Sequence, residues 1–367
     1  MRSHDRLDII HVGRGLAALV VCLLHINTAT TYMFPRPLQF VSALGHLGVP
    51  VFFTISGFVV PYSLVKQGYT LRQFFRYLAR RMVRLDPPYL VVVAITLAMI
   101  AVRSARSHAA FPYSATDIAL HLGYLSGLAG RPWVVSVFWT LGIEFQFYIL
   151  VGLCFGAGSW LAAFVLRSPW ARFWSMMLVF VALDLIGRRF FQPWMGDDRY
   201  GALWLFHQPH FWVGICAFVV RLNKLPAWTI VLFSVLMLVW TYGIPGVTRV
   251  PILSREVIQS LVETWTVLMA FGMAMVLLPS HVSLRDVPYL GPALIGLGTI
   301  SFSLYVTHLL LAGALSSRLT RYGPYTAFLT ELAACLALAT VFWWGVERPA
   351  LAFSRRIRFR ETASPAK

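Results

Sequence analysis

Long apolar runs separated by short, arginine-rich polar stretches dominate the pattern of this chain. A helix that spans a membrane needs about 20 mostly apolar residues, and runs of that length favour such helices over strands. The pattern predicts about ten membrane helices, over residues 7–30, 40–62, 87–104, 134–157, 172–190, 200–221, 226–243, 260–279, 290–316 and 326–346. A further stretch, 116–128, is expected to lie at the membrane interface or to re-enter it. The predicted fold is therefore all-α and polytopic.

The composition excludes several classes of protein. Only 12% of the residues are charged, whereas about a quarter are charged in an ordinary soluble domain. The formal charge of +17 could indicate a nucleic-acid partner, but the basic residues lie mainly between the apolar runs, where they act as orientation signals. We therefore expect no nucleic-acid partner. The four cysteines stand singly in apolar segments without the spacing of metal ligands, and no metal site is expected.

The basic residues also predict the orientation. With the N-terminus inside, more lysines and arginines fall on the cytosolic side than on the outer side, so both termini are predicted to be cytosolic. Residues 1–353 are expected to form one transmembrane domain, and the basic tail, 354–367, to lie on the cytosolic surface against membrane lipids. The predicted location is the inner (plasma) membrane.

The first predicted helix carries an arginine and a histidine eleven residues apart, Arg14 and His25. At about 100° and 1.5 Å per residue, both lie on one helix face, roughly 16 Å apart along the axis. An arginine inside a bilayer costs about 2.5–3.5 kcal/mol on insertion scales, which indicates a functional role. The alternative is an arginine that reaches the cytosolic interface and a hydrogen-bonded core histidine.

Four arginines, at positions 72, 76, 80 and 84, repeat every four residues and are expected to form one stripe on a helix. Guanidinium groups match phosphate oxygens, so Arg72, Arg80 and Arg84 are candidates for holding the phosphates of a nucleotide-bearing donor. The alternative is an interfacial helix bound to anionic lipid headgroups.

Two more polar groups lie inside predicted membrane helices. Ser56 follows Gly48 in a segment whose small residues allow close helix packing. Glu144 falls near mid-membrane among aromatic residues, and a carboxylate at that depth needs a partner. Arg14 or His25 could be that partner, and a carboxylate beside His25 would orient and polarise its ring.

Several other histidines fall in the outer halves of their helices, and a polar cavity open to the outside would account for them together. They are His46, His207, His210 and His308. Each one alone is also consistent with a hydrogen-bonded core residue. No carboxylate accompanies His207 and His210 at ligand spacing, which argues against a metal pair.

Six segments, in order, resemble the membrane acyltransferase-3 family. They are Arg14-Gly-Leu-Ala with His25, Phe52-Phe-Thr-Ile-Ser-Gly-Phe58, Arg80-Arg81-x-x-Arg84-Leu-x-Pro87-x-Tyr89, Trp139-x-Leu-x-x-Glu144-x-Gln-Phe-Tyr148, Ser301-Phe-Ser-Leu-Tyr305-x-x-His308 and Glu347-Arg-Pro349. The resemblance covers about residues 8 to 350. It implies an integral-membrane O-acyltransferase that moves an acyl group, commonly acetyl from cytosolic acetyl-CoA, to a hydroxyl of a cell-envelope carbohydrate.

The resemblance also implies roles for particular residues. The family's arginine–histidine pair maps onto Arg14 and His25, and its helix-4 acid onto Glu144. His25 is then the general base, with a covalent acyl-histidine as the mechanistic alternative. The donor is expected to bind at Arg14, Arg72, Arg80, Arg81, Arg84 and Ser56, of which Arg81 rests on the family motif alone.

This chain departs from the family pattern in two places. Many members have an aspartate three residues before the arginine, where this chain has His11, and a second acid in the helix-4 motif, where it has Phe145. The rival interpretation is a transporter or flippase of an envelope lipid or sugar, which would also gather ionisable residues around a midplane cavity. No inverted repeat is visible in the sequence, and the six motifs favour the enzyme.

Overall fold

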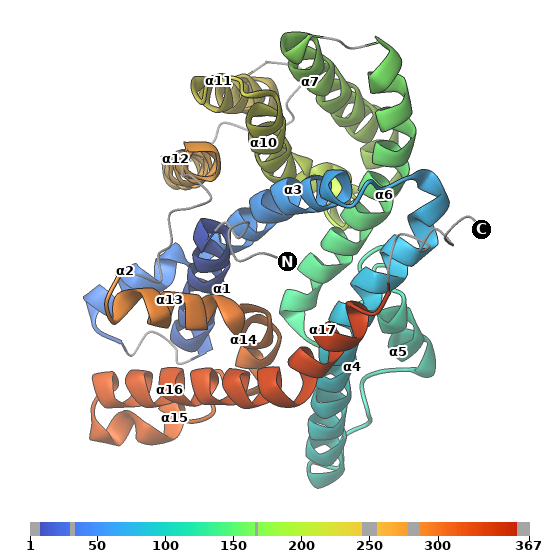
Figure 1. Ribbon diagram of the computed structural model, residues 1–367. Coiled ribbons are helices and arrows are strands. Elements are labelled where there is room, and N and C mark those ends of the chain that lie inside the picture. Colours follow the sequence, from blue (N-terminus) through green and yellow to red (C-terminus); the bar gives the residue numbers. More distant parts are fainter. Residues whose placement is uncertain (1–7, 30–33, 166–167, 244–254, 278–286, 358–367) are drawn as a thin grey trace, which may run out of the picture.

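The computed structural model describes residues 8–29, 34–165, 168–243, 255–277 and 287–357, and within these ranges the chain forms helices and turns without any strand (Figure 1). The longer helices are α1 (Asp8–Ala29), α3 (Gly48–Lys66), α4 (Phe74–Arg106), α6 (Trp139–Val165), α7 (Pro169–Ile186), α10 (Trp204–Asn223), α11 (Trp228–Leu238), α12 (Arg255–Leu277), α13 (Leu290–Thr299) and α16 (Pro324–Phe342). The shorter ones are α2 (Arg36–Ala43), α5 (Ala115–Leu122), α8 (Gln192–Met195), α9 (Asp197–Tyr200), α14 (Ser301–Thr307), α15 (Ser316–Leu319) and α17 (Arg348–Ser354). The all-α prediction is confirmed.

Seven helical segments in the described ranges are long and apolar enough to cross a membrane. They are Asp8–Ala29, Arg36–Lys66, Leu71–Arg106, Ser136–Phe155, Asp197–Asn223, Gln259–Leu277 and Pro324–Ser354. A bent pair, Leu290–Thr299 with Ser301–Leu310, would be an eighth, and the apolar helix Trp228–Thr241 is shorter. Helices occupy all ten predicted ranges, but ten crossings are not confirmed, and the sides of the termini stay a prediction. The structure indicates a multi-pass membrane protein. Most of the predicted tail, 358–367, lies outside the described residues.

Helix α4 differs most from its predicted range. It begins at Phe74 instead of near residue 87 and continues through Pro87 and Pro88 to Arg106. The arginine-rich segment is therefore the first part of a long spanning helix and not a separate interfacial helix. A proline removes one backbone hydrogen bond of a helix, so a helix that continues through two of them is unusual. The surrounding bundle nevertheless holds the segment helical, with Pro88 buried.

Helices α3 and α10 cross at very short range through two glycines. A Cβ added to Gly214 would lie 1.9 Å from the backbone oxygen of Thr54, and one added to Gly57 would lie 2.0 Å from that of Phe211. The Thr54 hydroxyl also donates a hydrogen bond of 2.9 Å to the His210 carbonyl. Small residues allow this close packing of membrane helices, so the glycines fix how α3 sits on α10.

Helix α1 is held in the same way between α3 and α13. A Cβ on Gly15 would meet the Gly298 nitrogen at 2.7 Å, and one on Gly48 would meet the Ala17 oxygen at 2.6 Å. The helix that carries Arg14 and His25 is therefore fixed from both sides.

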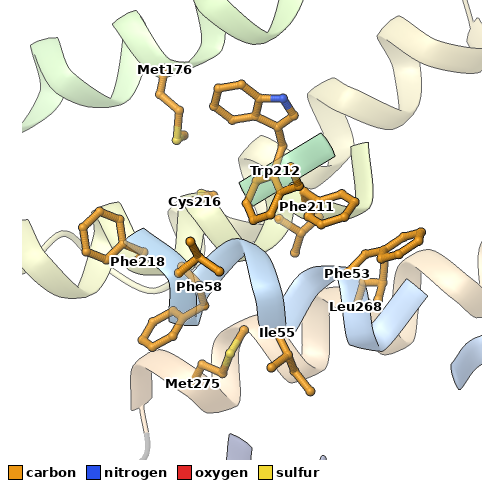
Figure 2. Packing of buried hydrophobic residues seen from close by; sticks show 14 of the residues in the cluster. Phe53, Ile55, Phe58, Met176, Phe211, Trp212, Cys216, Phe218, Leu268 and Met275 are labelled. Carbon is orange, nitrogen blue, oxygen red and sulfur yellow. The ribbon is translucent and has the colours of Figure 1, made fainter. Parts of the chain in front are cut away.

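The apolar core around α3 and α10 joins them to α6, α7, α11 and α12. Figure 2 shows α3, with Phe53 and Phe58, running between α10, which carries Phe211, and α12, which carries Leu268 and Met275. The Phe53 and Phe211 rings stack with centroids 4.5 Å apart. Because these side chains leave little room for sliding, α3 has a fixed register against α10.

A bend of 55° separates α13 from α14 within one predicted span. Glu347, in the π-helical turn Trp343–Glu347, accepts hydrogen bonds from the Ser303 backbone N–H (3.1 Å) and hydroxyl (2.6 Å). All of α14 is buried. The bend therefore brings a short polar helix into the centre of the bundle, between α1, α4 and α16.

Candidate active site

Two neighbouring cavities lie inside the bundle, and they have different chemistry. The first, here the arginine cavity, has about 790 Å³ of empty space including its mouth, and its polar lining is Arg14, Ser56, Arg81, Arg84, Thr140, Glu144, Tyr148 and Tyr305. The second, here the histidine cavity, has about 1100 Å³, and its lining includes His25, His46, Trp139, His207 and His210. Both are lined by Val49, Phe53 and Tyr305. The cavities therefore share one wall.

Aromatic side chains form that wall. Phe52 and Tyr305 meet edge to face with ring centroids 5.5 Å apart. The Tyr305 hydroxyl lies 2.7 Å from Thr140 Oγ1 and 3.1 Å from the Val137 carbonyl oxygen. Since these hydrogen bonds hold Tyr305 to the start of α6, the wall between the cavities is a defined part of the fold.

Three arginines line the arginine cavity. Arg14 comes from α1, and Arg81 and Arg84 come from α4. Among the described residues, none of the three forms an ion pair with a carboxylate. Arg81 instead donates to Ser63 Oγ at 3.1 Å, and its guanidinium lies over the Tyr148 ring, 5.0 Å from the centroid. Three guanidinium groups on one cavity favour a ligand with several negative charges.

The arginine stripe expected from the sequence is only partly correct. Arg84 lines the cavity, but Arg80 donates to Gln67 Oε1 at 2.7 Å, and Arg72 is exposed in the turn Leu71–Gln73 that precedes α4. A four-residue spacing advances about 40° around a helix at each step, so positions 72 and 84 would lie about 120° apart. Arg81 lies about 60° from Arg84 around the helix and Arg80 about 40° from it on the other side, so the spacing alone could not show that Arg81 lines the cavity and that Arg80 bonds to Gln67.

Glu144 lies in the arginine cavity and not beside His25. Its Oε1 accepts a 2.7 Å hydrogen bond from Ser56 Oγ and another from the Tyr148 hydroxyl, one helical turn further along α6. No hydrogen bond joins it to Arg14 or His25 in the described part of the chain. The expected orienting contact with His25 is therefore not found, because His25 lies three turns along α1 from the level of this cavity.

His25 is half-buried in the wall of the histidine cavity, and its ring is held by a second histidine. His25 Nδ1 lies 2.9 Å from the Val21 carbonyl oxygen and 3.2 Å from His308 Nε2. His308 is fully buried, and its own Nδ1 lies 3.1 Å from the Leu304 carbonyl oxygen. His308 ends the motif that begins at Ser301, but no residue spacing in the sequence predicted that it would contact His25.

Of the four other histidines expected at one polar cavity, three line the cavity of His25 and His308 does not. His46, His207 and His210 line the same cavity as His25, as expected for a shared polar cavity. His46 Nε2 lies 3.8 Å from Glu263 Oε2, and His207 Nε2 lies 2.9 Å from the Gly201 carbonyl oxygen. Within the described ranges, no group of three or more His, Cys, Asp or Glu side chains is placed to hold a metal ion.

The segment between α4 and α6 covers this end of the bundle. The Ser114 hydroxyl and backbone N–H donate to Asp117 at 2.7 and 2.9 Å and lower the pKa of that carboxyl. One turn later, His121 Nε2 accepts a hydrogen bond of 2.9 Å from the Val134 backbone N–H. These contacts hold α5 and fix the chain just before Ser136, which lines the histidine cavity.

Comparison with known proteins gives one match that spans nearly the whole chain. Residues 7–348 match the family model described as an acyltransferase domain. Comparisons with curated proteins and with solved structures gave no match. The matched range contains every residue that lines the two cavities, so the family match and the polar interior of the bundle fall on the same part of the chain.

Proposed function

The chain belongs to the acyltransferase 3 family, which indicates a membrane acyltransferase, and we propose that it transfers an acyl group from acyl-CoA to a carbohydrate hydroxyl. In this proposal the donor is cytosolic acetyl-CoA, the acceptor is a cell-envelope carbohydrate, and the protein lies in the inner (plasma) membrane. The observation that carries the proposal is the pair of cavities, one cationic and one lined by histidines, on two sides of a shared wall.

The arginine cavity takes the donor. Coenzyme A carries several phosphate charges at one end, and Arg14, Arg81 and Arg84 present guanidinium groups that no carboxylate of the described residues neutralises. Glu144, held by Ser56 and Tyr148, lines the same cavity, and Tyr148 in turn supports Arg81. Glu144 is thus a positioning residue for the donor site.

The acyl group passes the shared wall to reach His25. Arg14 and His25 lie roughly 16 Å apart along α1, at about 1.5 Å per residue. Coenzyme A has a long flexible arm between its phosphates and its sulfur, so one donor can contact the arginines and place its thioester near the wall.

His25 then acts as the general base for an acceptor in the histidine cavity. The acceptor hydroxyl oxygen attacks the thioester carbonyl carbon while its proton passes to His25. The carbon–sulfur bond breaks, and the departing thiolate takes the proton from His25 to give free coenzyme A. Trp139 and the other histidines of the cavity supply aromatic and hydrogen-bonding surface for a sugar ring.

Purified protein tests this proposal when it is incubated with radiolabelled acetyl-CoA and an envelope carbohydrate extract. We expect label to enter the carbohydrate fraction, and His25→Ala to abolish this incorporation. Leu16→Ala, on the exposed face of the same helix, is the matched control and is expected to stay active. Failure of the intact protein to consume acetyl-CoA would reject the proposed donor.

A further inference from the structure

The half-buried His25 and the fully buried His308 form a pair with a defined hydrogen-bond direction. The two rings lie 5.0 Å apart between centroids and are inclined by 48°. His25 comes from the straight helix α1, whereas His308 follows α14, the short helix beyond the bend. The closest nitrogens are His25 Nδ1 and His308 Nε2, 3.2 Å apart.

Backbone carbonyls determine which nitrogens carry protons. A carbonyl oxygen only accepts, so the Nδ1 atom 3.1 Å from the Leu304 oxygen makes His308 an Nδ1–H donor. In the neutral ring the Nε2 of His308 is then an acceptor. By the same argument, His25 Nδ1 carries a proton that is directed to the Val21 oxygen at 2.9 Å and shared with His308 Nε2.

We propose that His308 is a positioning residue that acts with the Val21 carbonyl to hold the His25 ring in the Nδ1–H tautomer, and so leaves His25 Nε2 as the nitrogen that takes the proton from the acceptor. The tautomer follows from the hydrogen bonds alone. Its catalytic consequence rests on the proposed function. A base must keep a lone pair facing its substrate, and with Nδ1 occupied on both sides, Nε2 is the ring nitrogen left for the histidine cavity.

The same pair stabilises His25 after it has accepted a proton. Both nitrogens of an imidazolium donate, and His308 Nε2 stays an acceptor as long as the Leu304 carbonyl holds the proton on Nδ1. Among the described residues, no hydrogen bond or ion pair joins the His25 ring to a carboxylate. The neutral His308 Nε2 therefore orients the His25 ring, which was the role expected of Glu144. His308 does not line either cavity and acts through His25.

The bent helix explains how His308 reaches this place. Ser303 is anchored to Glu347, and Tyr305 is anchored at the start of α6. These two anchors lie five and three residues before His308, respectively, so the ring position is fixed by contacts outside α1. A histidine held by another helix can restrict the rotation of the His25 ring more strongly than a contact within α1.

Nitrogen-15 NMR of the full-length protein in detergent, with labelled histidine, tests the tautomer directly. Two other histidines serve as internal references. His121 Nε2 accepts from the Val134 N–H and is therefore an Nδ1–H ring, while His207 Nε2 faces the Gly201 carbonyl and is an Nε2–H ring. Single substitutions assign the signals. We expect His25 to resemble His121, and a His25 signal that resembles His207 would overturn the proposal.

Two substitutions then test the role of His308. In His308→Leu only the Val21 carbonyl is left to hold the proton on His25 Nδ1, so we expect a part of the His25 population to change to the Nε2–H form. We also expect kcat for acetyl-CoA turnover to fall about tenfold or more, a part of the 10²–10⁴-fold that a general base supplies. The KM for acetyl-CoA should stay within about twofold, because the arginine cavity is untouched. His308→Gln offers an amide oxygen as acceptor and should restore both the Nδ1–H form and most of the turnover.

An unchanged His25 signal and unchanged kcat in folded His308→Leu would show that His308 is only a packing residue. If His308→Leu does not fold, the wild-type spectrum still tests the His25 tautomer, and His308→Gln still tests the role of the acceptor at position 308. The proposed function can fail separately, since a protein that ignores acetyl-CoA would still show the Nδ1–H tautomer if the hydrogen-bond assignment is right.

Discussion

Replacing Gly214 by alanine tests the close crossing of α3 and α10, on which the shape of both cavities depends. The added methyl group would lie 1.9 Å from the Thr54 backbone oxygen and 2.8 Å from the Phe58 backbone nitrogen. Neither contact can be relieved by turning a side chain, because both partners are backbone atoms. The helices would have to separate by about 1.5 Å to restore an ordinary contact of 3.4 Å, and overpacking of this kind costs about 1–3 kcal/mol.

The upper half of that range is expected here, and the damage should extend to function. Helix α3 carries Ser56, which holds Glu144, and Phe53, which lies in the shared wall. We expect Gly214→Ala to lower the thermal midpoint in detergent by several degrees and to reduce acetyl-CoA turnover. The assay is thermal unfolding followed by scintillation counting of transferred acetyl label on the same preparation.

Gly296→Ala is the matched control, because a Cβ at this helical glycine meets no atom within 4 Å. Alanine favours helix over glycine by up to about 1 kcal/mol, so this variant should be as stable as the wild type or more so. Equal stability of Gly214→Ala and Gly296→Ala would refute the claim that α3 and α10 are locked by backbone contact.

Two more predictions concern the donor site and the orientation. Arg84→Ala should weaken acetyl-CoA binding about tenfold or more, since hydrogen bonds to charged groups are worth about 1.5–3 kcal/mol, while the exposed Arg356→Ala should bind normally. Equal affinity in calorimetry would remove Arg84 from the donor site. A cysteine at exposed Arg36 should react with an impermeant thiol reagent from outside intact cells, and one at exposed Lys224 should not. Labelling at Lys224 would reverse the predicted orientation.

The helices themselves could be predicted from the sequence because a membrane helix is recognised by length and apolarity alone. Helices lie in all ten predicted ranges. The sequence did not predict where a helix bends or where it continues through a proline. The bend between α13 and α14 depends on Ser303 and Glu347, which are 44 residues apart and meet only in the folded chain. The continuation of α4 through Pro87 depends likewise on packing that overrides a local preference.

The site residues show the same division between local and tertiary information. The face shared by Arg14 and His25 is a property of one helix, and the structure places both on cavities. The partners of Glu144 and His25 come from other elements or other positions of the same helix, and no spacing rule supplied them. The predicted depth grouped the histidines near the histidine cavity. It could not distinguish His308, which contacts His25 Nδ1 and does not line the cavity, from the histidines that do.

Turnover by His25→Gln, measured together with donor binding, tests the central claim most directly. Glutamine can keep a hydrogen bond to the Val21 carbonyl or to His308, but it cannot accept a proton from an acceptor hydroxyl. The account predicts that this variant folds and binds acetyl-CoA with nearly unchanged affinity in the arginine cavity, and that it transfers no acetyl label. Transfer at a rate near that of the intact protein would contradict it, because the base would then lie elsewhere.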